Sequence, residues 1–273
     1  MTAAPEPTVA DVAAWWATAV SRVEPGVIEL RGRPIQSLIG TASLVDMVWL
    51  LLRGDLPTPT QAGLLEAALV AGVDHGPHAP SIAAARMAAT CGVGLNGAVA
   101  TGLNLLGDVH GGAGQQCLEL LTEICDLVQD SEAPDAATWD AAAGEILTSW
   151  RMRSRYIPGF GHRFHPIDPR RDPLLGLVEA ARLAGEVAGR HRDAALAVER
   201  ALRTRGGRQV PMNIDGATAV IYGELGFAPP LARGLFVLSR SIGVLAHAWE
   251  ETQQGRRIKG PIPPNIRPMY LDR

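Results

Sequence analysis

Three histidines and one aspartate stand beside glycine in polar turns, where a side chain can reach into a cleft. They are His75, His110, His162 and Asp215. The run Gly159–Arg163 around His162 is the most informative, because its two glycines allow backbone conformations closed to other residues and a close approach to a ligand. Basic side chains follow His162, among them Arg170. This arrangement suits a polyanionic substrate.

His110 and Asp215 each stand where a helix should begin. Helix N-termini offer free backbone N–H groups and the positive end of the helix dipole, so both turns are suited to help bind an anion. Taken singly, each residue also has a structural explanation. His110 is then an ordinary turn residue, and Asp215 is a helix N-cap.

Two pairs with His-x-x-His spacing raise the question of a metal site. They are His75 with His78 and His162 with His165. Both pairs lie in loops rich in proline and glycine, not on one helical face, and no acidic or cysteine ligand is set beside them. We therefore predict no metal. His247 lies within a helical pattern and is predicted to be structural.

The elements that must position these residues are helices. Thr8 and Asp11 have the spacing of a capping box, and Ser43 and Gly54 bracket an apolar helical run. The predicted helices are Leu44–Arg53, Thr60–Ala71, Ser81–Thr90, Gly97–Leu106, Ala113–Val128, Ala137–Met152, Pro173–Ala188, His191–Leu202, Gly216–Gly223 and Pro229–Gln253. Strand-like alternation is confined to Val27–Ile35, which we expect to form a small hairpin. The fold class is all-α.

The segment Gly92–Gly107 carries an unusual number of glycines and alanines. Glycine lowers helix propensity by ~1 kcal/mol relative to alanine, so close backbone packing must offset that loss. We expect this packing within the fold or across a dimer interface, and a loop-like stretch is the alternative.

Composition bounds the class of protein. The chain has 273 residues, 47% of them hydrophobic, and a formal net charge of -3, which favours a packed domain structure and gives no indication of nucleic acid or a membrane as partner. The three cysteines, Cys91, Cys117 and Cys125, lack zinc-ligand spacing, and the last two fit an apolar helical pattern. With no signal peptide visible, we expect a cytoplasmic protein.

The motifs together resemble those of the citrate synthase superfamily, in order and over nearly the whole chain. The matching stretches are Leu30–Ile35, Leu50–Thr58, Asp74–Pro77, His110–Ala113, Gly159–Arg163, Asp168–Arg170, Asn213–Asp215 and Ser239–Gly243. The resemblance implies an all-α fold of two domains, with the active site in the cleft between them. The large domain would comprise residues 1–110 and 217–273, and the small domain residues 111–216. It also implies a homodimer, with the glycine-rich segment as a plausible interface helix.

The resemblance implies a role for each site residue. Asp215 would move a proton on or off the acetyl methyl carbon, His110 would hydrogen-bond the thioester oxygen, and His162 would handle the proton of the oxaloacetate carbonyl or citryl hydroxyl. The carboxylate-binding residues would be His75, Arg170 and Arg240. The loop that binds CoA would comprise Pro158, Gly159, Phe160, Gly161 and Arg163. The basic residues expected to reach a neighbouring subunit's site would be among Arg257, Lys259 and Arg267.

These roles agree with the chemistry. The α-proton of a thioester is weakly acidic, so its removal needs a positioned base and stabilisation of charge on oxygen. Hydrogen bonds stabilise the enol, so the resemblance implies no cofactor besides the CoA thioester substrate. Guanidinium groups bind carboxylates bidentately, which suits a tricarboxylate.

Two departures resemble the citryl-CoA lyase branch, including the lyase module of ATP-citrate lyase. Gly76-Pro77 stands where synthases commonly carry a glutamate and an asparagine, and Gly216 follows Asp215 where they usually carry an aromatic residue. We therefore expect cleavage of citryl-CoA. Citrate synthase or 2-methylcitrate synthase activity is the first alternative, and a non-catalytic acyl-CoA- or citrate-binding protein is the second.

Lys259 stands where an arginine is typical of the superfamily. A lysine cannot make the two parallel hydrogen bonds with which a guanidinium group binds a carboxylate.

Overall fold

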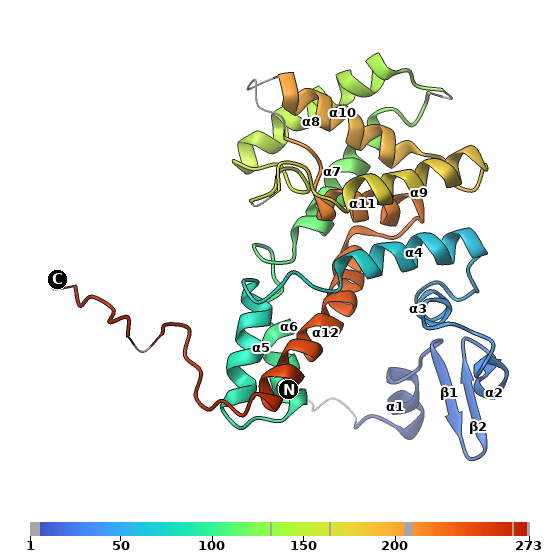
Figure 1. The fold of residues 1–273 in the computed structure, drawn as a ribbon. Helices are drawn as coiled ribbons and strands as arrows, with labels where there is room; N and C mark the ends of the chain where they lie inside the picture. The colour runs from blue at the N-terminus through green and yellow to red at the C-terminus, as the bar shows by residue number, and fades with distance from the viewer. Residues whose placement is uncertain (1–5, 132, 164, 205–209, 264, 272–273) are drawn as a thin grey trace, which may run out of the picture. The chain divides into compact units, whose positions relative to one another are not determined.

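The computed structural model describes residues 6–131, 133–163, 165–204, 210–263 and 265–271 (Figure 1). The chain divides into two compact units, residues 1–63 and residues 64–273. The domain boundaries predicted at His110 and Gly216 stay a prediction.

The first unit combines short helices with a small sheet. Its elements are α1 Val9–Trp15, β1 Ser21–Glu24, β2 Val27–Leu30, β3 Arg33–Pro34, α2 Ile35–Leu38 and α3 Leu44–Arg53. The expected capping boxes are present: Thr8 caps α1 and Ser43 caps α3, and Gly54 ends α3 in the left-handed conformation. The predicted hairpin is confirmed as β2 and β3, and β1 adds an antiparallel strand that was not predicted.

The second unit is built from helices. Helix α4, Pro59–Gly72, runs into it from the first unit, and the others are α5 Pro80–Thr90, α6 Leu95–Leu103, α7 Ala113–Leu127, α8 Ala136–Arg153, α9 Arg171–Leu183, α10 Arg190–Thr204, α11 Ile214–Glu224 and α12 Pro229–Gln253. The all-α class is confirmed. The predicted helices all form, and most of their ends move by one to three residues. The largest error is at α9, which ends at Leu183 and not at Ala188, because Gly185 takes a positive φ of 76°.

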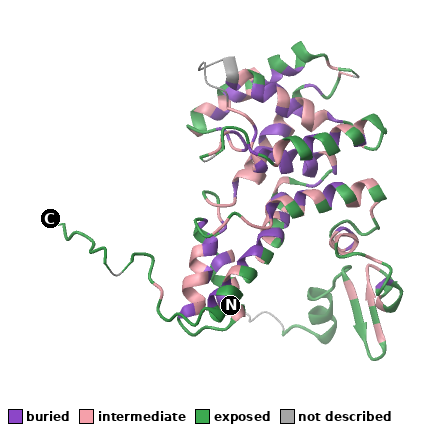
Figure 2. Cartoon of the chain, viewed as in Figure 1, coloured by how far each residue is buried: buried purple, intermediate pink, exposed green. Residues whose placement is uncertain are grey.

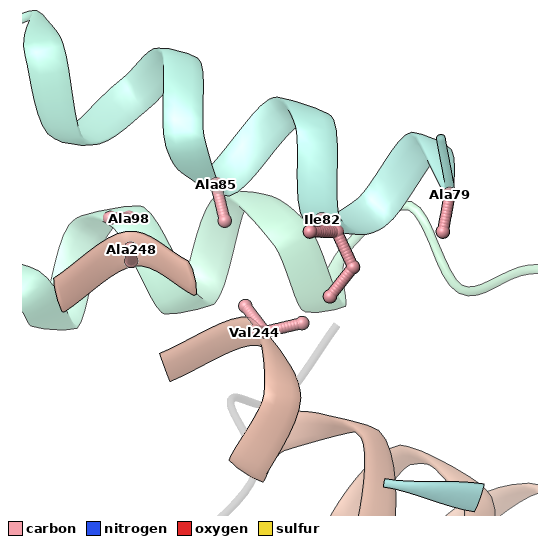
Figure 3. Close-up of a cluster of buried hydrophobic side chains, with 6 residues drawn as sticks. All are labelled: Ala79, Ile82, Ala85, Ala98, Val244 and Ala248. Atoms are coloured by element: carbon pink, nitrogen blue, oxygen red, sulfur yellow. The ribbon is translucent and has the colours of Figure 1, made fainter. Parts of the chain in front are cut away.

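Helices α5, α6 and α12 pack around one apolar cluster. Figure 3 shows its members pointing into the space between these helices: Ala79, Ile82, Ala85, Ala98, Val244 and Ala248. Small side chains let the three backbones approach closely. A Cβ at Gly102 would lie 2.7 Å from the carbonyl oxygen of Ser81 and 2.9 Å from a methyl carbon of Val244. The close packing predicted for the glycine-rich segment is therefore confirmed within the chain.

Helices α7 to α11 form the rest of the core. Helix α11 packs against α7, α9 and α10, and α8 packs against α10 and α7. Most residues from Ile214 to Gly223 are buried, so α11 lies at the centre of this group (Figure 2). Cys117 and Cys125 are buried in α7, as predicted.

Helix α12 runs from one group of helices to the other, in contact with α5, α6 and α7 (Figure 1). Among the described helices it alone is long and apolar enough to cross a membrane, judged by length and composition only. Arg240 and Glu251 are nevertheless buried in its contacts with the rest of the protein. Packing in the core accounts for part of its apolar composition, while Leu238, Ile242, Leu245 and Trp249 are 45–55% exposed.

Candidate active site

The glycine-rich loop that carries His162 is hydrogen-bonded along the start of α11. The N–H of Gly161 donates to the carbonyl oxygen of Pro211 at 2.7 Å, and the N–H of Asn213 donates to that of Gly159 at 3.0 Å. The side-chain amide of Asn213 also donates to the carbonyl oxygen of Gly161 at 2.7 Å. The loop and the first turn of α11 therefore hold each other in place.

Two glycines make this contact possible. Gly159 has a φ of 81°, and a Cβ there would lie 2.4 Å from the sulfur of Cys117. A Cβ at Gly216 would lie 2.4 Å from the carbonyl oxygen of Gly159. Contacts this short do not occur with a real Cβ, so a larger residue at either position would push the loop off the helix.

Asp215 lies in the first turn of α11, next to this loop. The side chain of Asn213 caps the helix by accepting from the N–H groups of Asp215 and Gly216, at 2.9 and 3.3 Å. Burial raises the pKa of Asp215; the nearby charges of Arg240 and Arg170 lower it, while Asp168 raises it. A carboxyl group with a raised pKa exchanges a proton with carbon more readily, as an acid or a base.

Asp168 is buried behind the site and binds Arg170 through both oxygens. Oδ1 accepts from Nε of Arg170 at 2.9 Å, and Oδ2 accepts from Nη2 at 2.9 Å. Oδ2 also accepts from the backbone N–H of Ile214, the first residue of α11, at 3.0 Å. Burial opposes ionisation, but these hydrogen bonds and the charge of Arg170 lower the pKa of Asp168 to about 2.

Arg170 and Arg240 meet at the C-terminal end of α4. Nη1 of Arg170 donates to the carbonyl oxygen of Ala71 at 3.3 Å, and Nε of Arg240 donates to that of Gly72 at 3.0 Å. Arg240 is only 5% exposed and stacks on the ring of Phe236, 4.8 Å from its centroid. The structure thus brings two cations to one place, as binding of a polycarboxylate requires.

His75 and His162 lie together beside these arginines. Their ring centroids are 5.7 Å apart in an edge-to-face arrangement. Burial lowers the pKa of His75, and the charges of Arg170, Arg240 and His162 lower it further, against a smaller effect of Asp168. Burial also lowers the pKa of His162. At neutral pH both rings are therefore uncharged and able to donate or accept a hydrogen bond.

The hydrogen bonds of His162 select its tautomer. Nδ1 accepts from the backbone N–H of His165 at 3.1 Å, so the proton of the neutral ring is on Nε2. Nε2 lies 4.0 Å from Oδ2 of Asp168. In this tautomer His162 donates a hydrogen bond from Nε2, which suits a keto oxygen.

His110 is oriented by the N-terminus of α5. Its Nε2 accepts from the backbone N–H of Ser81 at 3.3 Å and lies 3.0 Å from the Ser81 hydroxyl. The proton of the neutral ring is then on Nδ1, which is free to donate to an oxygen that gains negative charge. Burial lowers the pKa of His110, and the charge of Arg240 lowers it further. This arrangement suits the stabilisation of an enol.

The loop residues expected to bind CoA differ in exposure. Phe160 is buried and pairs with Met212 in an isolated antiparallel bridge, which holds the loop against the segment before α11. Pro158 is half-buried, and Arg163 is exposed beside His162. Gly159 is also buried and Gly161 is half-buried, so Arg163 is the accessible member of the loop, and CoA binding there stays a prediction.

The C-terminal basic residues are either exposed or paired within the chain. Arg257 and Arg267 are exposed. Nζ of Lys259 binds both oxygens of the buried carboxylate of Glu251, at 2.8 and 2.9 Å, and Arg86 binds the same group at 2.6 Å. Lys259 is thus paired within its own chain.

A pocket of ≈230 Å³ opens beside this ion-pair cluster and not over the histidines. Its lining residues are Pro77, Ala83, Arg86, Met87, Lys259, Gly260 and Pro261. A cross-subunit role for the C-terminal basic residues stays a prediction.

Sequence reasoning assigned no role to three residues that position the site. For Asp168 the sequence carries a weak indication, because it stands two positions before Arg170 in an Asp-Pro-Arg turn. Asn213 could have been found as an N-cap before α11. Ser81 gave no signal, because its contact with His110 joins positions far apart in the chain.

Residues 58–268 match the family model described as citrate synthase, C-terminal domain. The chain is 31% identical to a citrate synthase from Acidithiobacillus ferridurans over 219 residues, which cover 77% of this chain and 52% of that protein. It therefore spans about half the length of the curated relatives it matches.

Solved structures show the same fold. Citryl-CoA lyase from Hydrogenobacter thermophilus superposes with a TM-score of 0.79 at 29% identity, covering 94% of this chain and 95% of that one. ATP citrate lyase from Methanothrix soehngenii, solved with citrate and coenzyme A, superposes with a TM-score of 0.76 at 20% identity, covering all of this chain and 46% of that one. With the family model matched over most of its length, this chain belongs to the citrate synthase family.

Proposed function

We propose that the protein is a citryl-CoA lyase, which cleaves citryl-CoA to oxaloacetate and acetyl-CoA. One observation carries this choice: the chain superposes more closely on the citryl-CoA lyase from H. thermophilus, with a TM-score of 0.79, than on a citrate synthase from Thermotoga maritima matched over nearly the same share of both chains, with a TM-score of 0.58.

The acid portion of citryl-CoA would bind at the arginine pair. Three of the five N–H donors of Arg170 are used by Asp168 and Ala71, and Arg240 donates from Nε to Gly72. The remaining donors can bind carboxylates bidentately. His75, uncharged and 5.7 Å from His162 by ring centroids, would complete the carboxylate site.

Cleavage then needs three proton-handling groups. His162 would take the proton of the citryl hydroxyl, the carbon–carbon bond would break as the keto group forms, and its electron pair would pass to the acetyl fragment as an enolate. Nδ1–H of His110 would stabilise the enolate oxygen, and Asp215 would deliver a proton to its carbon. Since Nδ1 of His162 accepts from the backbone N–H of His165 in the free protein, the ring must release that contact and carry its proton on Nδ1, so that Nε2 receives the hydroxyl proton and then donates to the keto oxygen.

A paired assay tests the proposal. Purified protein is given citryl-CoA, and oxaloacetate is followed by coupled reduction; separately, CoA release is followed from acetyl-CoA plus oxaloacetate. We expect oxaloacetate release from citryl-CoA that is lost in Asp215→Ala. Absence of that release together with rapid CoA release from the second pair would overturn lyase activity.

Citrate synthase is the second candidate, favoured by the 31% identity to the enzyme from A. ferridurans. A 2-methylcitrate synthase belongs to the same alternative, because one extra methylene changes binding by only ~1–3 kcal/mol. Assays with acetyl-CoA and propionyl-CoA separate the two. A non-catalytic binding protein would instead retain ligand binding in Asp215→Ala, by calorimetry, with no turnover in the parent.

We further propose that the protein acts as a homodimer in the cytoplasm, with no resident cofactor. An exposed apolar stripe on α12 supports the dimer: Leu238, Ile242, Leu245 and Trp249 are 45–55% exposed and recur at helical spacing. Three free cysteines, of which Cys91 is exposed, favour a reducing compartment.

A further inference from the structure

Asp168 connects three parts of the candidate site through one buried carboxylate. Its side chain is fully buried; it contacts Arg170 and the start of α11, and lies 4.0 Å from the ring of His162. An isolated buried charge is costly, so a carboxylate is retained at such a place only with full hydrogen bonding. Asp168 meets this condition with four donors, two on the Arg170 side chain, one on its backbone and one on Ile214.

The first connection fixes which edge of Arg170 is free. A guanidinium group has five N–H donors in a plane. Asp168 takes the Nε donor and one Nη2 donor, and Ala71 accepts from Nη1. One donor each on Nη1 and Nη2 then remains for a ligand. Two donors on neighbouring nitrogens of one guanidinium can bind a carboxylate bidentately.

The second connection holds the helix that carries Asp215. Oδ2 of Asp168 accepts from the first backbone N–H of α11, on the residue before Asp215. This carboxylate also interacts with the positive end of the α11 dipole. The orientation of Arg170 and the position of Asp215 therefore depend on the same oxygen atom.

The third connection is electrostatic. Nε2 of His162 lies 4.0 Å from Oδ2 of Asp168, and the carboxylate favours the protonated ring. The other groups that face His162 are Arg170, His75 and His165; Arg170 and His165 act against protonation. Asp168 and Arg170 therefore have opposite effects on the pKa of His162: the carboxylate raises it and the guanidinium lowers it.

We propose that Asp168 is a positioning residue for the cleavage reaction. It fixes the carboxylate-binding edge of Arg170, holds the turn that carries Asp215, and stabilises the cationic His162 that forms when the ring takes the citryl hydroxyl proton. This inference rests on the proposed lyase function. It differs from a purely structural ion pair, because it predicts an effect on the protonation of His162.

The test compares Asp168→Asn with Arg170→Gln, using Asp172→Asn as a matched control. Asp172 is also an aspartate paired with an arginine, but its side chain is 71% exposed and outside the site. The pKa of His162 is measured in the free protein by NMR of labelled histidine, with the resonance assigned from His162→Gln. Citryl-CoA cleavage is measured across pH for each variant.

We expect opposite shifts from the two variants. Asp168→Asn removes the negative charge and lowers the pKa of His162, by on the order of one unit, while Arg170→Gln frees the carboxylate and raises it. The pKa that governs the acid limb of the pH profile of kcat/KM shifts in the same direction as the pKa of His162 in each variant. In Asp168→Asn, kcat/KM also falls about 100-fold. Asp168→Glu, which keeps the charge, restores the acid limb. Asp172→Asn matches the parent in each measurement.

Two results would overturn the inference. One is a folded Asp168→Asn whose His162 pKa and acid limb equal those of the parent. The other is an Arg170→Gln variant in which the pKa of His162 is unchanged or lower. This second result overturns the inference even if circular dichroism shows that Asp168→Asn does not fold. A parent without citryl-CoA cleavage refutes the proposed function alone, because the NMR titration needs no substrate.

Discussion

The carbonyl oxygen of Gly159 lies 2.4 Å from the place that the first side-chain carbon of any larger residue at position 216 would occupy. Gly216 follows Asp215, and Gly159 begins the turn that leads to His162. The absence of a side chain at position 216 is therefore what lets the two proton-handling residues share one rigid contact.

Gly216→Ala should separate the loop from α11. Overpacking in a tight site costs typically 1–3 kcal/mol, so we expect a free energy of unfolding lower by about 2 kcal/mol in urea denaturation. We also expect citryl-CoA cleavage to fall at least about tenfold, since small displacements of catalytic groups are costly. Gly234→Ala on α12 is the matched control, because nothing lies within 4 Å of a Cβ there. Equal activity of the two variants would contradict this account.

Asp215→Asn should remove the acid that protonates the enolate carbon and leave the fold intact. The helix cap comes from Asn213, not from the Asp215 side chain, so the first turn keeps its hydrogen bonds. Proton transfer by a positioned side chain is worth typically 10²–10⁴-fold, and kcat should fall within that range. The measurement is oxaloacetate release at saturating citryl-CoA, with circular dichroism as control. A loss under tenfold would assign the proton to another group.

Local signals predicted the helices well where the chain carried its own start and stop residues. Pro229–Gln253 was predicted with its observed bounds, and α3 with its Ser43 cap and Gly54 end. Strand β1 was missed because its only support is pairing with β2, and its four residues show no clear alternation. A strand of this kind is specified by its neighbour more than by itself.

The site residues were predictable as types, but their connections were not. Histidine and aspartate beside glycine could be read from the chain. The bond from Ile214 to Asp168 spans 46 positions, and the one from Ser81 to His110 spans 29. Such contacts depend on how helices pack, and the one from Ser81 decides which tautomer His110 adopts. The sequence therefore indicated the chemistry but not the protonation of the groups that perform it.

The apolar stripe on α12 should hold two subunits together. We expect Ile242→Asp to convert a dimer into a monomer in size-exclusion chromatography with light scattering, because a buried unpaired carboxylate in an interface is costly. Leu183→Asp, at a residue 73% exposed at the end of α9, is the matched control and should leave the dimer intact. A parent that is already a monomer at micromolar concentration, or an Ile242→Asp dimer, would refute this surface as the interface.

The pH dependence of stability should report His191, which lies outside the site. Burial lowers the pKa of His191 to about 4, with its ring packed on Gly223. The unfolded chain, with an ordinary histidine pKa near ~6.5, binds this proton first as pH falls. Stability should therefore be lost progressively between about pH 6.5 and 4, by roughly 3 kcal/mol in total at 1.36 kcal/mol per unit.

His191→Gln isolates this contribution in urea unfolding at pH 7.0, 5.5 and 4.5. Glu224, 3.8 Å from His191, has a pKa raised by burial, so its own contribution is largest at low pH and opposes that of the histidine. The informative quantity is therefore how the free energy of unfolding changes with pH in the parent compared with the variant, not the change in either protein alone. The parent should lose more stability on acidification than His191→Gln does. Parallel pH profiles would mean that the pKa of His191 is the same in the folded and the unfolded protein, which contradicts this prediction.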